Sequence, residues 1–196
     1  RQRRPPPPKP PPPKNGARPP RQEKIPRVPG DRPPLSFAQR RLLVIDQLDP
    51  NQATYNVPLA FQVNGRLDKT TLQMAADQLT TRHHSLRTTF PIAENGEHYQ
   101  HVAAKAHLPI THIDFTTQPA AARQAEARAW LEMEAQRPFN LSTGPLVRLS
   151  HLQLSDSEHI LVIVMHHIIT DGWSMTIFVR EFISLYLAQV QGAPAN

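Results

Sequence analysis

The chain has 196 residues, 39% of them hydrophobic, which is enough for one folded domain of ordinary size but hardly for two. It contains no cysteine, which excludes disulfides, thiolate metal sites and a cysteine nucleophile. The net charge of +6 comes from residues 1–34, which hold ten Lys and Arg against two acidic residues, so the remainder is mildly acidic. The longest strongly apolar run, Ile160–Met165, is only strand-sized, and no signal core precedes it. We therefore expect a cytoplasmic protein without a membrane helix.

Residues 1–34 form the first predicted segment, and 14 of the 22 prolines fall there. Proline lacks an N–H and resists helix and sheet, so we predict a disordered, semi-rigid, extended linker. The first aromatic residue is Phe37, so the segment offers no ring on which a nucleic-acid base could stack. Nucleic-acid binding is therefore not expected. Docking of this basic segment to an acidic protein remains an alternative.

From residue 35 onward, helical and strand patterns alternate, which is typical of an α/β domain. We predict a helix over 35–48, then a strand over 55–64 with one apolar face. Asp68 is placed to cap a helix that ends near His83. Short strands are expected over 86–90, 98–102 and 110–114. The next helix has an apolar stripe made of Ala122, Ala125, Ala129 and Met133.

Two strands and a helix complete the pattern. Residues 146–154 and 159–165 indicate a strand pair, and the second strand is apolar on both faces, which predicts a central place in the sheet. A last helix begins near Ser174. Its inward side is expected to carry Met175, Phe178, Phe182 and Leu185.

The segment 165–174 lies between the buried strand and the last helix, and it holds the candidate site residues His166, His167, Asp171 and Gly172. A loop at the end of a central strand can present a histidine for proton transfer. Neighbouring residues of an extended chain point in opposite directions, so one histidine at most faces a given cleft, which argues against a metal site made of both. Glycine allows a tight turn and a close backbone approach. A merely packed, hydrogen-bonded histidine pair is the structural alternative.

The pattern His-His-x-x-x-Asp-Gly over 166–172 resembles the active-site motif of condensation domains of nonribosomal peptide synthetases, which are related to chloramphenicol acetyltransferase. Residues 36–42 and 82–90 are similar to the family's Ser-x-Ala-Gln-x-Arg-Leu and Arg-His-Glu-x-Leu-Arg-Thr-x-Phe. Residues 138–141 and 144–148 resemble a further stretch of the family. The resemblance covers residues 35–196. It implies the N-terminal lobe of a chloramphenicol acetyltransferase-like fold, with a mixed sheet flanked by helices.

The resemblance also implies roles for single residues. His167 is expected to be catalytic, removing a proton from the attacking amine or stabilising the tetrahedral intermediate, with His166 and Gly172 as support. Asp171 is expected to be structural, in a buried ion pair with Arg82, and Arg87 is a further candidate for that network. The Gly172 N–H, near a helix start, is a candidate to polarise the substrate carbonyl.

The implied reaction joins an acyl or peptidyl thioester to an aminoacyl thioester through an amide bond. Both substrates are expected on the phosphopantetheine arms of an upstream donor and a downstream acceptor carrier domain, with no metal or organic cofactor bound directly. The C-terminal lobe and an adenylation domain are expected elsewhere in the same polypeptide, and the isolated lobe is expected to be inactive. The motifs resemble the subtype that joins an L-donor to an L-acceptor.

Two alternatives stay open at the level of the sequence. One is an acyltransferase of the same superfamily that acts on a soluble acceptor, and the other is a catalytically silent binding module. Dependence on carrier proteins distinguishes them. The sequence also departs from the family pattern at His84, where glutamate is usual, and at Leu43 and Val44, where an aromatic residue is common.

Overall fold

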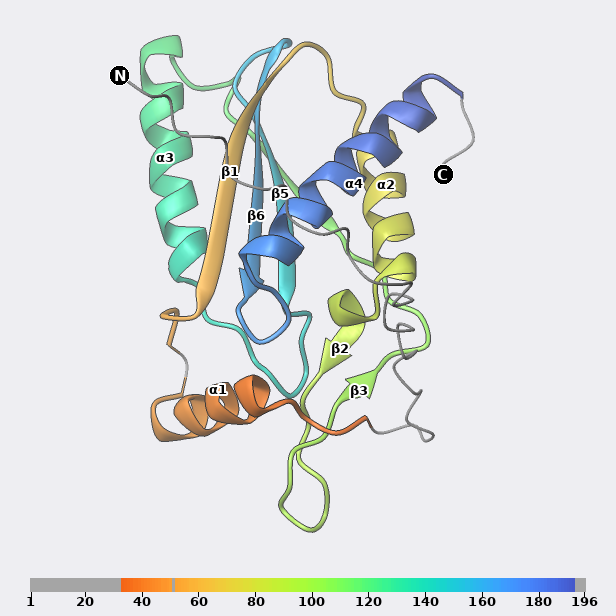
Figure 1. The fold of residues 1–196 in the computed structure, drawn as a ribbon. Coiled ribbons are helices and arrows are strands. Elements are labelled where there is room, and N and C mark those ends of the chain that lie inside the picture. The colour runs from red at the N-terminus through yellow and green to blue at the C-terminus, as the bar shows by residue number, and fades with distance from the viewer. Residues whose placement is uncertain (1–32, 51, 193–196) are drawn as a thin grey trace, which may run out of the picture.

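A mixed four-stranded sheet forms the centre of the fold (Figure 1). The computed structural model describes residues 33–50 and 52–192. The strands lie in the order β1 (Asn56–Asn64), β6 (Glu158–His166), β5 (Val147–Gln153) and β4 (Ile110–Asp114). Strand β6 is antiparallel to both of its neighbours, whereas β4 is parallel to β5. The central place that the sequence predicts for β6 is therefore confirmed.

Helices cover both faces of this sheet, which confirms the predicted α/β class. Figure 1 shows α2 (Lys69–Arg82) and α4 (Gly172–Val190) together on one face, and α3 (Ala120–Gln136) beside β1. Helix α1 (Phe37–Leu48) lies near the end of the sheet where β6 stops. Ser36 caps α1 in a reciprocal pair with Gln39, and Asp68 caps α2 through Thr71 N–H, as the sequence predicts for Asp68.

The alternation of β6 explains how one strand serves two cores. Its Ile163 and Met165 pack in a core with α2 and α4, whereas Val162 and Val164 pack in a second core with α3. The predicted inward residues of α4 are all buried, which confirms that stripe: Met175, Phe178, Phe182 and Leu185. A strand with apolar side chains on both faces is held rigidly, and it fixes the position from which the next loop departs.

Two local predictions are wrong. The strand expected over 86–90 is instead a 3-10 turn, η1 (His84–Arg87), followed by the two-residue strand β2 (Thr88–Thr89), which pairs with β3 (His101–Val102). The chain turns here because the N–H of Leu86 bonds to the carbonyl of His83, and the hydroxyl of Thr88 bonds to the carbonyl of His84.

The apolar stripe predicted for α3 is also misplaced, because Ala125, Ala129 and Met133 are exposed. The buried positions are Ala127 and Glu134. Two arginines neutralise the Glu134 carboxylate, so an acidic residue occupies an inner position that a purely hydrophobic pattern assigns to another side chain.

Most of the predicted linker, residues 1–32, lies outside the described residues. Pro33 and Pro34 are described, and the side-chain amide of Gln100 donates to the carbonyl of Pro34 at 2.7 Å. Among the described helices, none is both long enough and apolar enough to cross a membrane.

Candidate active site

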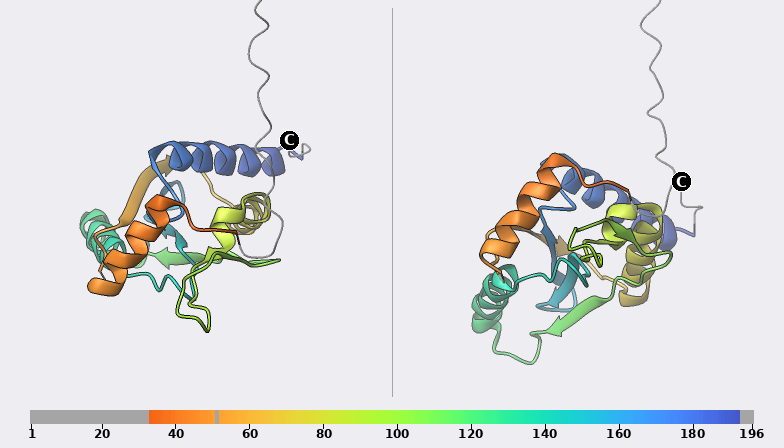
Figure 2. Two further views of the ribbon diagram at one scale, coloured as in Figure 1. Left: turned by 60° about the horizontal axis from the view of Figure 1, so that its bottom comes forward. Right: turned by 90° about the horizontal axis from the view of Figure 1, so that it is seen from below.

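The loop 167–171 connects the end of β6 to the start of α4, as the sequence predicts for the histidine motif. Figure 2 views the molecule from the end at which this loop and helix α1 lie. Backbone bonds hold the chain at the last residue of β6 and the first residue of the loop: the N–H of His166 donates to the carbonyl of Leu146 at 3.0 Å, and the N–H of His167 donates to the carbonyl of Tyr55 at 2.8 Å. The loop therefore begins from two anchored positions.

His167 is exposed, and one of its ring nitrogens is already committed. Its Nδ1 lies 2.6 Å from the carbonyl oxygen of Thr170. A carbonyl oxygen only accepts hydrogen bonds, so Nδ1 must carry the proton and donate it. In the neutral ring this leaves Nε2 with a lone pair, which is the form that a general base requires.

His166 has the opposite environment, because its side chain is buried between the rings of Tyr55 and Phe139. Its Nδ1 accepts a hydrogen bond from the N–H of Ile168 at 3.1 Å, so its proton resides on Nε2. Burial, together with the neighbouring His167, lowers the pKa of His166 to about 4, and the ring is neutral near pH 7. The structure thus separates the two histidines as strand alternation predicts: one is enclosed and one is open to solvent.

Asp171 is exposed and serves as the N-cap of α4. Its Oδ1 accepts from the Ser174 N–H at 2.7 Å and from the Ser174 hydroxyl at 2.6 Å, and these bonds lower the pKa of the carboxyl group. The carboxylate is therefore directed at the first turn of the helix that it starts.

The predicted buried ion pair between Asp171 and Arg82 must be corrected. Arg82 Nη1 lies 3.1 Å from Glu181 Oε2, and no ion pair between Arg82 and Asp171 occurs among the residues that the structure describes. Glu181 lies ten residues beyond Asp171, which is roughly 15 Å along the helix at about 1.5 Å per residue. Because α2 packs against the middle of α4, its C-terminal arginine reaches Glu181 rather than the start of α4.

The two remaining predicted residues, Arg87 and Gly172, do not take part in an ion-pair network with Asp171 in the described part of the chain. Arg87, proposed as a further member of the same network, instead donates from Nη1 to the carbonyl of Ala103. Gly172 does not have a positive φ, so the turn does not require glycine. A Cβ atom at Gly172 would meet nothing within 4 Å, so the space beside its Cα is open.

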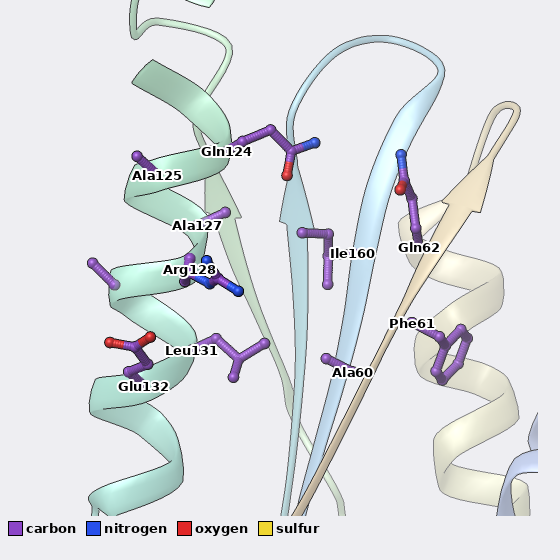
Figure 3. Close-up of a pocket in the computed structure, with 11 residues that line it drawn as sticks. Ala60, Phe61, Gln62, Gln124, Ala125, Ala127, Arg128, Leu131, Glu132 and Ile160 are labelled. Carbon is purple, nitrogen blue, oxygen red and sulfur yellow. The ribbon is translucent and has the colours of Figure 1, made fainter. Parts of the chain in front are cut away.

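A cavity of about 140 Å³ lies beside the loop, and its mostly apolar lining includes Met165, Ile169, Thr170 and Ser174. A larger cavity of about 840 Å³ lies between α3 and β1, and Figure 3 shows Arg128 and Gln62 on its two sides. None of the predicted site residues lines the larger cavity. Within residues 33–50 and 52–192, no group of three or more His, Cys, Asp or Glu side chains is arranged to hold a metal ion.

The sequence analysis did not identify two residues that hold the site and its surroundings, Thr170 and Glu181. Thr170 acts through its backbone carbonyl, which every residue type has, so no sequence signal identifies it. Glu181 could have been found, because it lies on the buried side of α4 between Phe178 and Phe182 in helical spacing. An acidic residue on an apolar helix face requires a cation, and Arg82 and His83 supply hydrogen bonds to it.

A model of the condensation domain matches residues 31–196. The chain belongs to the condensation domain family. It is 39% identical over 162 residues to a linear gramicidin synthase of Brevibacillus parabrevis, and 41% identical over 163 residues to a chondramide synthase of Chondromyces crocatus. These matches cover 83% of this chain but only 3% and 4% of those proteins, so the chain spans a small part of the relatives' length.

Solved condensation domains have the same fold. The starter condensation domain of rhizomide synthetase superposes with a TM-score of 0.77 at 26% identity, and the match covers 83% of this chain and 39% of that one. The first condensation domain of the calcium-dependent antibiotic synthetase, in complex with a substrate analogue, gives a TM-score of 0.76 at 26% identity, covering 84% of this chain and 39% of that one. The chain thus corresponds to about two fifths of these condensation domain structures.

Proposed function

We propose that this chain supplies the catalytic histidine of a condensation domain that forms an amide bond between two carrier-bound thioesters. The observation that carries the proposal is the geometry of His167: its imidazole is exposed at the end of a buried strand, and Nδ1 is held by the Thr170 carbonyl, so that Nε2 has the lone pair in the neutral ring. The chain's family and its relatives, which include a phosphinothricin tripeptide synthetase of Streptomyces viridochromogenes at 40% identity, support peptide synthesis as the setting.

In the proposed reaction, the amine of an aminoacyl thioester attacks the carbonyl carbon of an acyl or peptidyl thioester. An N–C bond forms, the C–S bond breaks, and the thiol leaves with a proton. Nε2 of His167 accepts the proton of the attacking amine or hydrogen-bonds the tetrahedral intermediate. The N–H of Gly172, in the first turn of α4 where amides have no partner within the helix, is a candidate donor to the carbonyl oxygen.

His166 supports this chemistry from behind, because it is buried and neutral and receives the Ile168 N–H. We assign Asp171 a structural role as the cap of α4. The segment up to residue 34 is proposed as a linker, and residues 35–196 as the N-terminal lobe. The matched condensation domains are more than twice as long as the part that this chain covers, which supports a second lobe as the other wall of the cleft.

The partners follow from the same proposal. A donor and an acceptor carrier domain deliver the substrates on phosphopantetheine arms, and an adenylation domain supplies the activated amino acid. Substrate transfer from carrier to carrier distinguishes this activity from acylation of a soluble amine.

The test uses the full-length synthetase with both carrier domains loaded. His167→Ala is expected to abolish formation of the condensed product on the acceptor carrier, whereas His101→Ala, at an exposed histidine of β3, leaves it unchanged. Product formation by His167→Ala at near the unmodified rate would remove His167 from the mechanism. Efficient transfer to a free amine without an acceptor carrier would instead indicate a soluble-acceptor acyltransferase.

A further inference from the structure

Behind His166 lies a buried column of three side chains, Phe139, Arg148 and Glu134, that the proposed reaction does not itself use. The ring of Phe139 meets the ring of His166 edge-on, with centroids 6.1 Å apart and an interplanar angle of 83°. The guanidinium of Arg148 lies over the Phe139 ring, 3.8 Å from its centroid. Phe139 is 7% exposed and His166 is 4% exposed, so both contacts are shielded from water.

Glu134, in the last turn of α3, holds the arginine of this column. Its Oε1 accepts from Arg148 Nε and from Arg137 Nη2, at 2.5 Å and 2.7 Å. Burial raises the pKa of the Glu134 carboxyl, but the hydrogen bond from Arg137 and the charge of Arg148 outweigh that effect and lower it, so the group is ionised. Arg148 Nη2 also donates to the carbonyls of Glu134 and Arg137.

This arrangement depends on the shape of arginine. A planar guanidinium can stack on a ring while its edge donates to a carboxylate and to carbonyl groups, and a lysine ammonium cannot do both. A buried ion pair is weak evidence for stability in itself, because the cost of desolvation offsets most of the attraction. Its rigid geometry is the property that an apolar substitute would lack.

The far end of the column reaches the loop that carries His167. His166 Nδ1 accepts the Ile168 N–H at 3.1 Å, and the His166 carbonyl accepts the Ile169 N–H at 3.1 Å. His167 lies between these bonded positions. A rotation of the His166 ring would break the bond to Ile168 and release the backbone that orients the next residue.

We propose that Phe139 and Arg148, held by Glu134, are positioning residues that fix the His166 ring and thereby the direction of His167 Nε2. The expected effect on catalysis rests on the proposed function. The effect of the column on the His166 ring can be measured without any turnover.

The first measurement is on the 196-residue chain, by long-range 1H–15N correlation of the histidine rings. In Phe139→Leu and Arg148→Lys, we expect His166 to lose its single tautomer and its pKa to rise from about 4 toward the ordinary value. The matched control is Phe182→Leu, the same change at a buried ring of α4 outside the column. If Phe139→Leu does not fold, Glu134→Gln, which keeps the size of the side chain, is measured in its place.

The second measurement is condensation by the full-length synthetase. We expect the column variants to lower kcat by about 10- to 100-fold with little change in KM, since a small misplacement of a catalytic group costs that much. Phe182→Leu should lose similar thermal stability and keep its kcat. Unchanged His166 spectra in the column variants, or equal kcat losses in the control, would overturn the inference. Retained activity in His167→Ala would overturn the proposed function alone, because the spectra report the column independently.

Discussion

His167 Nδ1 and the Thr170 carbonyl oxygen lie 2.6 Å apart, and this short contact sets the protonation pattern of the candidate site. Because the carbonyl can only accept, His167 is expected in the Nδ1–H tautomer. His166, whose Nδ1 accepts from Ile168 N–H, is expected in the Nε2–H tautomer. Two adjacent histidines therefore hold their protons on opposite nitrogens.

Nitrogen-15 NMR of the histidine rings near pH 7 checks this pattern. His98 serves as a reference in the same spectra, because its Nδ1 lies 2.8 Å from the Phe90 carbonyl and must carry the proton. We expect His167 to match His98 and His166 to differ from both. A common tautomer for His166 and His167 would contradict the assignment of Nε2 as the free base.

The helix cap at Asp171 predicts a stability effect that depends on hydrogen bonding rather than on charge. Asp171→Ala is expected to lower the thermal midpoint by a few degrees, since it removes both bonds to Ser174. Asp171→Asn should retain most of the stability, because asparagine caps helices about as well. Equal losses in the two variants would mean that the carboxylate charge, and not the cap, is what matters.

A double-mutant cycle tests which partner Arg82 uses. The changes Arg82→Ala and Glu181→Ala are expected to couple by about 0.2–1 kcal/mol, as partly exposed ion pairs do. The changes Arg82→Ala and Asp171→Ala are expected to be additive. Denaturant unfolding of the single and double variants measures both cycles, and coupling with Asp171 instead of Glu181 would restore the ion pair that the sequence motif suggested.

The sequence was sufficient for the features that follow from periodicity and local capping. The apolar run that ends at Met165 predicts strand β6, and the position of Asp68 before a helical pattern predicts the N-cap of α2. The site loop follows from its place after that strand. Family resemblance, rather than periodicity, singled out His167 in it.

Features that depend on distance between elements could not be predicted in the same way. Whether Arg82 meets Asp171 or Glu181 is decided by the point at which α2 crosses α4, and a helix offers several acidic positions along its length. The apolar pattern predicted for α3 leaves out Glu134 because it is acidic. Glu134 is nevertheless buried, since Arg148, which follows it by 14 residues, neutralises its charge. A charged residue can be buried when its partner comes from another element of the fold, and a local sequence pattern does not predict such a pairing.

Acid should destabilise the fold through buried histidines. His151 is fully buried, and its ring nitrogens lie 3.0 Å from His112 Nδ1 and 3.0 Å from His159 Nδ1. Burial, then the charges of His159, His112 and Lys69, lower the pKa of His151 to about 4. In the unfolded chain it titrates near the ordinary 6.5, so between these values the unfolded state binds more protons. The free energy of unfolding should therefore fall as pH drops from about 6.5 to about 4, and His151 adds nothing further below that.

The variant His151→Gln removes this titration, so its stability should depend less on pH by at most about 1.4 kcal/mol per pH unit. His166, with its pKa also lowered to about 4, keeps a similar dependence in the variant. Urea unfolding between about pH 4 and pH 7 measures the slopes, with the exposed His101→Gln as control. Equal slopes in His151→Gln and the unmodified chain would show that His151 is not the buried neutral group described here.

Two glycines with positive φ separate backbone strain from steric contact. Gly144, in the segment before β5, has a φ of 61°, and a Cβ there would lie 2.8 Å from Thr89 Cγ2. Gly96 has a φ of 82° with nothing within 4 Å. Both alanine variants bear the cost of left-handed backbone, but Gly144→Ala should lose about 1–3 kcal/mol more stability, since overpacking costs about that. Thermal unfolding of the two variants measures this difference in stability. Losses of equal size would show that the Thr89 side chain moves aside at no cost.

Strand β6 also determines how often the candidate catalytic histidine leaves its place. Amide hydrogens of doubly paired central strands exchange with solvent only through rare, large openings of the structure. The amides of His166 and His167 continue that pairing into the loop, through Leu146 on one side and Tyr55 on the other. His167 therefore combines a solvent-exposed ring with a backbone N–H that is bonded to a neighbouring strand segment, and we expect that amide to exchange slowly with solvent, unlike the amides of a fluctuating loop.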